Sequence, residues 1–490
     1  MVPTHSSRAS QASPIPRGPH VPSWGSRRGS GRAWHYNTPK SARGSARDIM
    51  LPLDSRPRDS SPRRAEGRLI KQFSQGVIDP KLRDVELRIT NCTYAASYSL
   101  HDQSPYVISV PSQPRAWKPP KLPCTVPHDE GFYLLDHDGA RFPNHPLQPA
   151  VQAIFTLNPS FNSSGINIVA CASSLGQIFR YIRSADLSFR LDVEMVGNTL
   201  FIVRNLKDKV QPGVNGYGHS FLDTFTSEDP EWPETKSHQR IVSYTLANMK
   251  LAVRFECDGF LTHDRDGRLH PLTKANFKLD KTIPTGSYPL KKYGNIVPQD
   301  SLIEIKTRSA QEKISYSDHL PRLWLRQIHN FVNAYHLKGE FGDVEIFDVR
   351  QALTEWEATN QKDIRLFISI LSQIRAKVKE LHPMKVELCR KGTGPLQLRK
   401  RTGERRKALS DAWEHRWATG CPDQQGRNPS FSKDKDDGRN ITVEEGYPRR
   451  TCSPSPEWIC DESYRSDADA FSADFTACDI ECGYCGRCPY

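Results

Sequence analysis

Two short stretches of the sequence place charged side chains two residues apart, the spacing that puts side chains on one face of a strand. The first stretch, RFECDGFL, carries Glu256 and Asp258, and the second, SLIEIKTRS, carries Glu304 and Lys306. Two neighbouring carboxylates repel each other unless one takes up a proton or a cation lies between them. The pattern therefore predicts a site for a hard divalent cation, Mg²⁺ or Mn²⁺, at these carboxylates.

Carboxylates that hold such a cation beside a lysine suit the cleavage of phosphodiesters. Oxygen ligands from Asp258 and Glu304 would hold the metal, which polarises a phosphate and lowers the pKa of a bound water molecule. Lys306 would stabilise the negative charge that develops, and Glu256 would support the site. The alternative is structural: an ion pair between Glu304 and Lys306 on an edge strand, and a solvated strand face for Glu256 and Asp258.

A mixed α/β domain must position these residues, and we expect it over residues 85–385 with an insertion at 262–300. Apolar residues alternate with polar ones on both sides of Gly197-Asn198. The same alternation surrounds Asn248. Both patterns predict β-hairpins, and the second hairpin carries the first charged motif.

Helices are expected before and after the second charged motif. Residues 165–184 begin as a strand and continue as a helix. The segment 321–336 carries apolar residues at helical spacing and Pro321 in its first turn, which predicts one helix over its whole length. Residues 343–350 predict a strand, and 361–381 a long amphipathic helix that closes the domain.

The order of these motifs resembles the PD-(D/E)xK nuclease superfamily, which has an acid on one strand and (D/E)-x-K on the next. Within it the sequence is most similar to the DXO/Rai-type decapping exoribonucleases, which carry an E-hydrophobic-D and then an E-hydrophobic-K motif. These stand here as ECD at 256–258 and EIK at 304–306. The family follows them with a helix bearing a Trp and a Gln, and Trp324 and Gln327 lie in a similar segment.

The resemblance covers roughly residues 165–385 and implies a PD-(D/E)xK nuclease-like core, a central mixed sheet flanked by helices. It implies a Mg²⁺- or Mn²⁺-dependent nuclease acting on RNA. More narrowly, it implies an enzyme that removes incomplete 5′ caps and degrades the RNA from its 5′ end. The residue roles that it implies are catalysis by Lys306, Glu304 and Asp258, metal binding by Asp258, Glu304, Glu256 and Asp223, and nucleic-acid contact by Gln327, Arg254 and Arg308.

Departures from the family pattern support a second hypothesis, a catalytically inactive nucleic-acid-binding or scaffold protein on the same fold. Leu222 lies where we place the family's third acid, with Asp223 one residue further on, and Ala172 lies where the family has an arginine. The insertion lengthens the interval between the two charged motifs. Gln327 is one residue further from Trp324 than in the family.

The first 84 residues predict a disordered basic arm. Residues 1–80 hold 14 Lys or Arg and 5 Asp or Glu, in a chain whose net charge is +12. Such a Ser-, Arg- and Pro-rich sequence buries too little apolar surface to offset the entropy of ordering it. The arm suits weak, salt-sensitive binding to nucleic acid. A solvated tail without a partner is the alternative.

The C-terminal part, 386–490, is expected to be polar and mostly disordered. Its basic run at 399–407, RKRTGERRK, suits a nuclear-import signal or an RNA contact, and a charged linker is the alternative. No signal-peptide pattern and no apolar run of membrane-spanning length occur, so we expect an intracellular protein, nuclear rather than cytoplasmic. The chain's only Asp-Asp pair, 436–437, lies in this tail, so the paired Asp-rich helices of a prenyl-diphosphate synthase are not expected.

Four cysteines lie close together near the end of the sequence: Cys478, Cys482, Cys485 and Cys488. Tight thiol clusters with glycines between them suit tetrahedral Zn²⁺ or an iron–sulfur cluster. A reduced, flexible tail is the alternative. The segment therefore predicts a possible zinc site separate from the acidic one.

Overall fold

The structure is a computed structural model that describes residues 67–420 with short internal gaps. The gaps are 102–104, 131–132, 207–209, 212–215, 230–234, 278–282, 311–315 and 404–405. The four C-terminal cysteines, and with them the expected zinc site, lie outside the described residues. The mixed α/β class expected from the sequence is confirmed.

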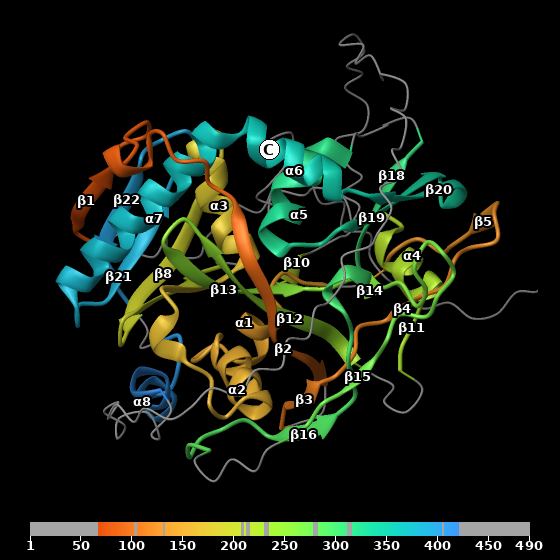
Figure 1. Ribbon diagram of the computed structural model, residues 1–490, viewed down its shortest axis with the longest axis horizontal. Coiled ribbons are helices and arrows are strands. Elements are labelled where there is room, and N and C mark those ends of the chain that lie inside the picture. The colour runs from red at the N-terminus through yellow and green to blue at the C-terminus, as the bar shows by residue number, and fades with distance from the viewer. Residues whose placement is uncertain are drawn as a thin grey trace, which may run out of the picture. The chain divides into compact units, whose positions relative to one another are not determined.

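An eleven-stranded sheet forms the centre of the described part of the chain (Figure 1). Its spatial order is β1 (Leu69–Phe73), β22 (Leu396–Lys400), β21 (Val386–Arg390), β8 (Phe189–Val196), β9 (Thr199–Arg204), β7 (Ile168–Cys171), β13 (Met249–Glu256), β12 (Thr235–Leu246), β2 (Ile89–His101), β3 (Val107–Pro111) and β16 (Leu290–Tyr293). Both expected hairpins are confirmed, because β8 pairs antiparallel with β9 and β12 with β13. Gly197 takes a φ of 58° in the first turn, a conformation that suits glycine.

A seven-stranded sheet, counted among the described residues, carries the second charged motif. Its order is β11 (Thr226–Ser227), β4 (Ala116–Trp117), β14 (Gly259–Phe260), β18 (Leu302–Ser309), β19 (Asn330–Leu337), β20 (Glu340–Asp348) and β5 (Cys124–Thr125). Strand β18 pairs antiparallel with β14 and parallel with β19. Two small ladders join β6 (Tyr133–Leu134) to β10 (Val210–Gln211) and β15 (Thr273–Lys274) to β17 (Asn295–Ile296).

Helices cover both faces of the large sheet (Figure 1). They are α1 (His137–Arg141), α2 (Gln148–Leu157), α3 (Ala172–Ile182), α5 (Leu320–Arg326), α6 (Arg350–Thr359), α7 (Gln361–Leu381) and α8 (Asp411–Thr419). Helix α4 (Gly218–Phe225) instead packs on the seven-stranded sheet. Short 3₁₀ turns occupy Pro80–Leu82, Ser163–Gly165, Gln299–Ser301 and Tyr316–His319. Helices α3, α5 and α7 share one apolar core with the sheet, and α2 and α8 share a second. None of these described helices is long and apolar enough to cross a membrane.

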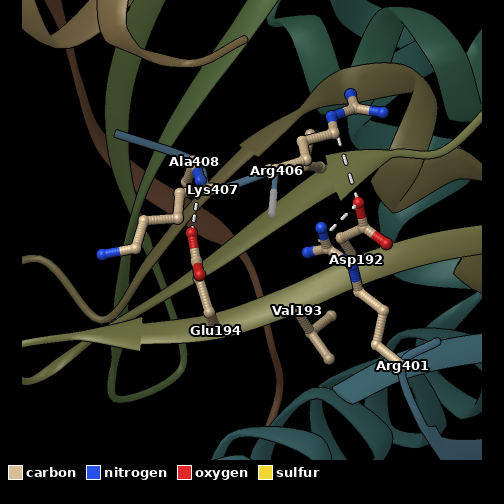
Figure 2. Close-up of a pocket in the computed structure, with 8 residues that line it drawn as sticks. Asp192, Val193, Glu194, Arg401, Arg406, Lys407 and Ala408 are labelled. Carbon is tan, nitrogen blue, oxygen red and sulfur yellow. Dashed lines mark hydrogen bonds and ion pairs between the residues drawn. The ribbon is translucent and has the colours of Figure 1, made fainter. Parts of the chain in front are cut away.

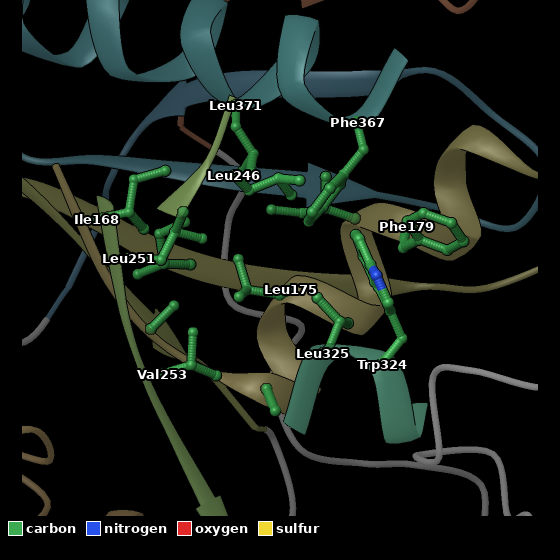
Figure 3. Packing of buried hydrophobic residues seen from close by; sticks show 14 of the residues in the cluster. Ile168, Leu175, Phe179, Leu246, Leu251, Val253, Trp324, Leu325, Phe367 and Leu371 are labelled. Carbon is green, nitrogen blue, oxygen red and sulfur yellow. The ribbon is translucent and has the colours of Figure 1, made fainter. Parts of the chain in front are cut away.

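The first core fixes the helix that matters for the site, α5. Figure 3 shows Trp324 and Leu325 of α5 packed among Leu175 and Phe179 of α3 and Phe367 of α7. Full burial of a large apolar side chain stabilises a fold by roughly 1.5–3 kcal/mol. Helix α5 is therefore held against the sheet by its own apolar face, and the polar residues on it have fixed positions.

The helix predicted over 321–336 is wrong beyond residue 326. Helix α5 ends at Arg326, Gln327 takes a φ of 53°, and Asn330–Leu337 form β19. Strand β19 lies between β18 and β20, and seven of its eight residues are buried. A strand buried on both faces is apolar without strict alternation, so its apolar residues also matched helical spacing.

Ordered elements continue on both sides of the domain expected at 85–385. Strand β1 precedes it, and β21, β22 and α8 follow it. The large sheet extends through these strands, because β21 pairs with β8 and β22, and β22 pairs with β1. Trp413 and Trp417 of α8 are buried in the second core. Two aromatic anchors in an otherwise polar segment were too sparse to indicate this helix from the sequence.

Candidate functional site

The two charged motifs lie next to each other because β14 pairs with β18. The single strand expected through Glu256 and Asp258 is wrong, because β13 ends at Glu256, Asp258 lies in the connection, and β14 belongs to the other sheet. The carboxylate of Asp258 accepts a 2.8 Å hydrogen bond from the backbone N–H of Ile305 in β18. On the other side of β14, Gly259 permits the close approach of the chain before β4, since a Cβ there would lie 2.8 Å from the carbonyl oxygen of Arg115. The fold thus brings the acid of the first motif to the strand of the second.

Glu304 and Lys306 point into the interior from β18. Their side chains are 0% and 4% exposed, and Lys306 Nζ lies 3.0 Å from Glu304 Oε1. Two further cations reach the same carboxylate from α5. Arg322 Nε lies 2.7 Å from Oε1, and Arg326 Nη1 lies 2.6 Å from Oε2. We call Glu304, Lys306, Arg322, Arg326 and Asp258 the Glu304 cluster.

The charges of the cluster shift the pKa values of its two carboxyl groups in opposite directions. Burial alone would raise the pKa of Glu304, but Arg322, Arg326 and Lys306 together outweigh it and hold that pKa well below its usual range. Burial and the negative charge of Glu304 raise the pKa of Asp258 to about 6. Glu304 is therefore a firmly ionised carboxylate whose charge is matched by cations of the protein.

These residues do not fit a divalent cation in the arrangement described. Mg²⁺ and Mn²⁺ need several oxygen ligands with lone pairs directed at the ion. Both oxygens of Glu304 instead face cations at 2.6–3.0 Å, and Asp258 directs an oxygen at a backbone N–H. Across the described residues, no three His, Cys, Asp or Glu side chains converge as a metal site would require.

The two other expected metal ligands, Glu256 and Asp223, interact elsewhere. The Glu256 carboxylate is 42% exposed and lies 3.8 Å from the imidazole of His137. The Asp223 carboxylate is 69% exposed and pairs with Arg115 at 3.1 Å. Of the four carboxylates expected to bind metal, the structure thus brings together Asp258 and Glu304 alone.

Helix α4 approaches β18 from the face opposite to Glu304. Leu222 of α4 packs against a third apolar core that contains Ile303 and Ile305. Neighbouring side chains of a strand point to opposite faces, so these isoleucines point away from Glu304. Asp223, next to Leu222, therefore cannot join Glu304 without a shift of the helix.

The three residues expected to contact nucleic acid lie in different surroundings. Gln327 follows α5, and its side-chain amide donates a 2.7 Å hydrogen bond to the carbonyl oxygen of Trp324. Arg254 is buried, with Nη1 2.8 Å from Asp138. Arg308 is half-buried near the end of β18. Contact with nucleic acid stays a prediction for each of them, and for Arg254 it would have to disturb a buried ion pair.

Sequence reasoning missed Arg322 and Arg326. A signal was present, because Arg322 and Arg326 are four residues apart, the spacing that places two side chains on the same face of a helix. Arg326 also stands at the distance from Trp324 at which the resembled family has its Gln, and Gln327 is one residue beyond it. What the sequence does not contain is the packing of α5 beside β18, which brings both arginines to Glu304.

A second buried ionic cluster joins α1 to β13. Arg254 lies 2.8 Å from Asp138 and 3.3 Å from Asp136, and the hydroxyl of Tyr98 donates a 2.6 Å hydrogen bond to Asp138. Burial raises the pKa of Asp138 to about 6, although Arg254 opposes the shift. We call Arg254, Asp136 and Asp138 the Arg254 cluster.

The basic run at 399–407 is partly turned into the protein. Arg401 and Arg406 approach Asp192 of β8 at 3.6 and 3.9 Å (Figure 2). With Glu194 of the same strand, these side chains line a pocket that leaves no room for a water molecule. The pocket is a packed ionic contact, so at least these two charges of the run serve the fold.

Solved structures similar to the chain are Rai1 and Dxo1 proteins, names that belong to the family that the motifs resemble. Rai1 of S. pombe in complex with 3′-FADP has a TM-score of 0.46 and 14% identity, covering 68% of this chain and 99% of that one. Rai1 of Candida albicans in complex with pU5-Mn²⁺ has a TM-score of 0.46 and 12% identity, covering 71% and 99%. Dxo1 of K. lactis in complex with manganese has a TM-score of 0.40 and 10% identity, covering 69% and 96%.

Likenesses at these TM-scores and identities say nothing about activity, so the function has to follow from the chain's own residues. No curated protein sequence matches the chain. One family model matches residues 78–386, well over half of the chain. The chain belongs to the family described as Domain of unknown function (DUF8563).

Proposed function

We propose that the chain binds nucleic acid, preferably RNA, on a nuclease-like fold and does not cut it in the arrangement described. The observation that carries the proposal is that both oxygens of Glu304 face cations of the protein, Arg322 and Arg326 among them. The carboxylate that metal-dependent cleavage of a phosphodiester would need is already neutralised. The remaining charge of the cluster is positive, which favours phosphate over metal.

Charge outside the cluster supports nucleic acid as the partner. The chain has a net charge of +12. Within 262–300, the described residues expose Arg265, Arg268, Lys274, Lys291 and Lys292. Basic side chains of this kind bind phosphates and release counterions, which gives affinity that falls with rising salt. The insertion is therefore the described segment in which we expect RNA contact.

A metal-dependent nuclease, including one that acts at capped 5′ ends of RNA, is the second candidate. It is favoured by the contact between the two motifs through Asp258 and Ile305 and by the 3.0 Å approach of Lys306 to Glu304. It requires that Glu304 give up its arginine partners. The two candidates differ in one observable, which is whether RNA becomes shorter in the presence of Mn²⁺.

The test measures binding and cleavage of labelled single-stranded RNA by the full chain, with EDTA and with millimolar Mn²⁺. We expect equal affinity in both conditions by fluorescence anisotropy, and RNA of unchanged length on a denaturing gel. Single-stranded DNA of the same sequence measures the preference for RNA. Mn²⁺-dependent shortening that a Glu304→Gln/Lys306→Ala variant loses would establish the nuclease instead, and absence of RNA binding at low salt would refute the proposal.

Charge reversals at two lysines of the insertion and at one lysine of α7 locate the binding surface. Lys274→Glu with Lys292→Glu changes the insertion, whereas Lys362→Glu changes an exposed lysine of α7. For each lysine that contacts phosphate, the slope of log affinity against log salt should fall by about 1. We expect this loss for the insertion variant and no loss for the α7 variant. Equal slopes in both variants would place RNA binding outside the insertion.

A further inference from the structure

The arginines of α5 occupy the place at the acidic site where a divalent cation would be needed. We infer that Arg322 and Arg326 act as resident cations at Glu304 and close this site to divalent metal, so that removal of both creates a metal site. The inference concerns the same site as the proposed function. It rests on that proposal in so far as it explains why the chain would not cut RNA. Its test is separate, because it measures metal and not RNA.

The charge balance of the Glu304 cluster turns on these two residues. Glu304, Asp258 and Lys306 alone make two carboxylates and one ammonium, a set with one net negative charge when both acids are ionised. A buried pair of carboxylates of this kind attracts a divalent cation. The two guanidiniums change the balance to one net positive charge. A second multivalent cation is then repelled, and burial strengthens that repulsion.

The contacts of the two guanidiniums use the positions that a metal ion would use. Arg322 shares Glu304 Oε1 with Lys306, and Arg326 takes Oε2. Arg326 also lies 3.5 Å from the carbonyl oxygen of Glu256, the next oxygen of the first motif. One guanidinium thus bridges both motifs, as a bound cation between the two strands would.

The backbone that carries the two arginines is fixed, because α5 is held from three sides. Trp324 is buried, and its indole N–H donates a 2.8 Å hydrogen bond to Glu357 of α6. Gln299 donates hydrogen bonds of 3.2 and 2.9 Å to the carbonyl oxygens of Arg326 and Gln327. The Arg326 guanidinium lies 5.8 Å from the ring centre of Phe255, within cation–π distance. Both arginines therefore extend toward Glu304 from a fixed backbone, and Arg326 has a partner besides the carboxylate.

The experiment measures Mn²⁺ binding to the full chain by the loss of the free-ion electron paramagnetic resonance signal. The central variant is Arg322→Met/Arg326→Met, which keeps an unbranched side chain about as long as arginine up to Nε and removes both charges. We expect one Mn²⁺ site per chain, at least tenfold tighter than anything that wild type shows. Adding Asp258→Asn to this variant should remove the site, since Asp258 and Glu304 would be its ligands.

Two controls separate charge from general loosening. Arg322→Lys/Arg326→Lys keeps the positive charge, so it should bind no more Mn²⁺ than wild type. Arg190→Met removes the guanidinium 2.7 Å from Glu387, another fully buried carboxylate, while its neighbour on β8, Asp192, keeps Arg401 and Arg406 as partners. It should not gain a site either, because one carboxylate alone holds the ion poorly.

Three results would overturn the inference. The first is that the wild-type protein binds Mn²⁺ as tightly as the double methionine variant does, and that Asp258→Asn in the wild type abolishes this binding. The second is a folded double variant, shown by near-ultraviolet circular dichroism in EDTA, that gains no site. If the double methionine variant does not fold, Arg322→Gln/Arg326→Gln decides, because it removes both charges and keeps a polar side chain at each position; no gain there is the third. A chain that shows the expected metal behaviour but binds no RNA would refute the proposed function and leave this inference standing.

Discussion

The Glu304 cluster and the Arg254 cluster are built from the same side-chain types in opposite proportions. In the first, one fully buried carboxylate meets three cations within 3.0 Å. In the second, one buried guanidinium meets two carboxylates, Asp138 at 2.8 Å and Asp136 at 3.3 Å. One region is therefore short of negative charge and the other is short of positive charge at its centre.

The pKa values show what this difference does. The pKa of Glu304 lies far below its usual range because three cations outweigh the effect of burial. In the Arg254 cluster burial is opposed by fewer charges, so the pKa of Asp138 rises to about 6 from its usual 3.8. The lesson is that the number of partners decides how far into the acid range a buried acid keeps its charge. It also decides whether the acid remains available to an outside cation.

The largest effect in either region should come from Glu304→Gln. The substitution keeps the size of the side chain and leaves Lys306, Arg322 and Arg326 buried with Asp258 as their nearest acid. Removing one partner of a buried ion pair costs about 3–5 kcal/mol, because the remaining charge is uncompensated. We expect a loss of at least that size in the free energy of unfolding, measured with urea.

The matched comparison is Glu387→Gln, which removes a buried carboxylate that one guanidinium contacts, Arg190 at 2.7 Å. Its loss should be smaller, since one cation is left in place of three and the Arg190 side chain is 26% exposed. Equal losses in the two variants would mean that the arginines of α5 find water or other partners without cost. The view of Glu304 as the centre of its cluster would then fail.

Some parts of this site depend on local sequence patterns and could be predicted, whereas others depend on tertiary packing and could not. The hairpins, the two charged motifs and their meeting at neighbouring strands depend on local alternation and on strand order, both of which a single sequence carries. The hydrogen bond from the Ile305 backbone N–H to Asp258 was not predicted, because it depends on how the two strands pair. The arginines were not predicted either, because a helix face indicates which residues lie together but not which strand they meet.

The same limit explains the error in β19. Residues 330–337 are apolar enough for either structure, and their pairing with β18 and β20 decides in favour of a strand. Pairing between strands distant in sequence is a tertiary effect that overrides local spacing. The short strands β21 and β22 were not predicted for the same reason, since β21 pairs with the distant β8 and β22 pairs with β21 and the distant β1.

The second prediction concerns Arg254→Met, which leaves Asp136 and Asp138 without their shared cation. We expect a loss of about 3 kcal/mol at neutral pH and above. The loss should shrink in acid, because Asp138 can take up a proton and become neutral. Urea unfolding at several pH values measures it, and a loss that does not change between about pH 4 and pH 8 would contradict the account.

The sign of the pH dependence in wild type follows from the same group. Asp138 has a folded pKa of about 6 against 3.8 usually, so the folded state binds more protons between those values. The contribution of Asp138 to the free energy of unfolding should therefore be greatest below about pH 4 and should fall as the pH rises to about 6. Asp138→Asn should remove about 3 kcal/mol of that fall, given two pKa units. Asp258, with a pKa also about 6, should account for a similar part.

The smallest effect should come from Asp223→Ala, which tests the remaining expected metal ligand. The carboxylate is 69% exposed and pairs with Arg115 at the surface, so its loss should cost less than about 1 kcal/mol. Placed in the Arg322→Met/Arg326→Met background, it should leave Mn²⁺ affinity unchanged, because α4 packs on the opposite face of β18 from Glu304. A marked drop in affinity would mean that α4 moves when metal binds. The Glu304 site would then have a third ligand that the arginines normally keep away.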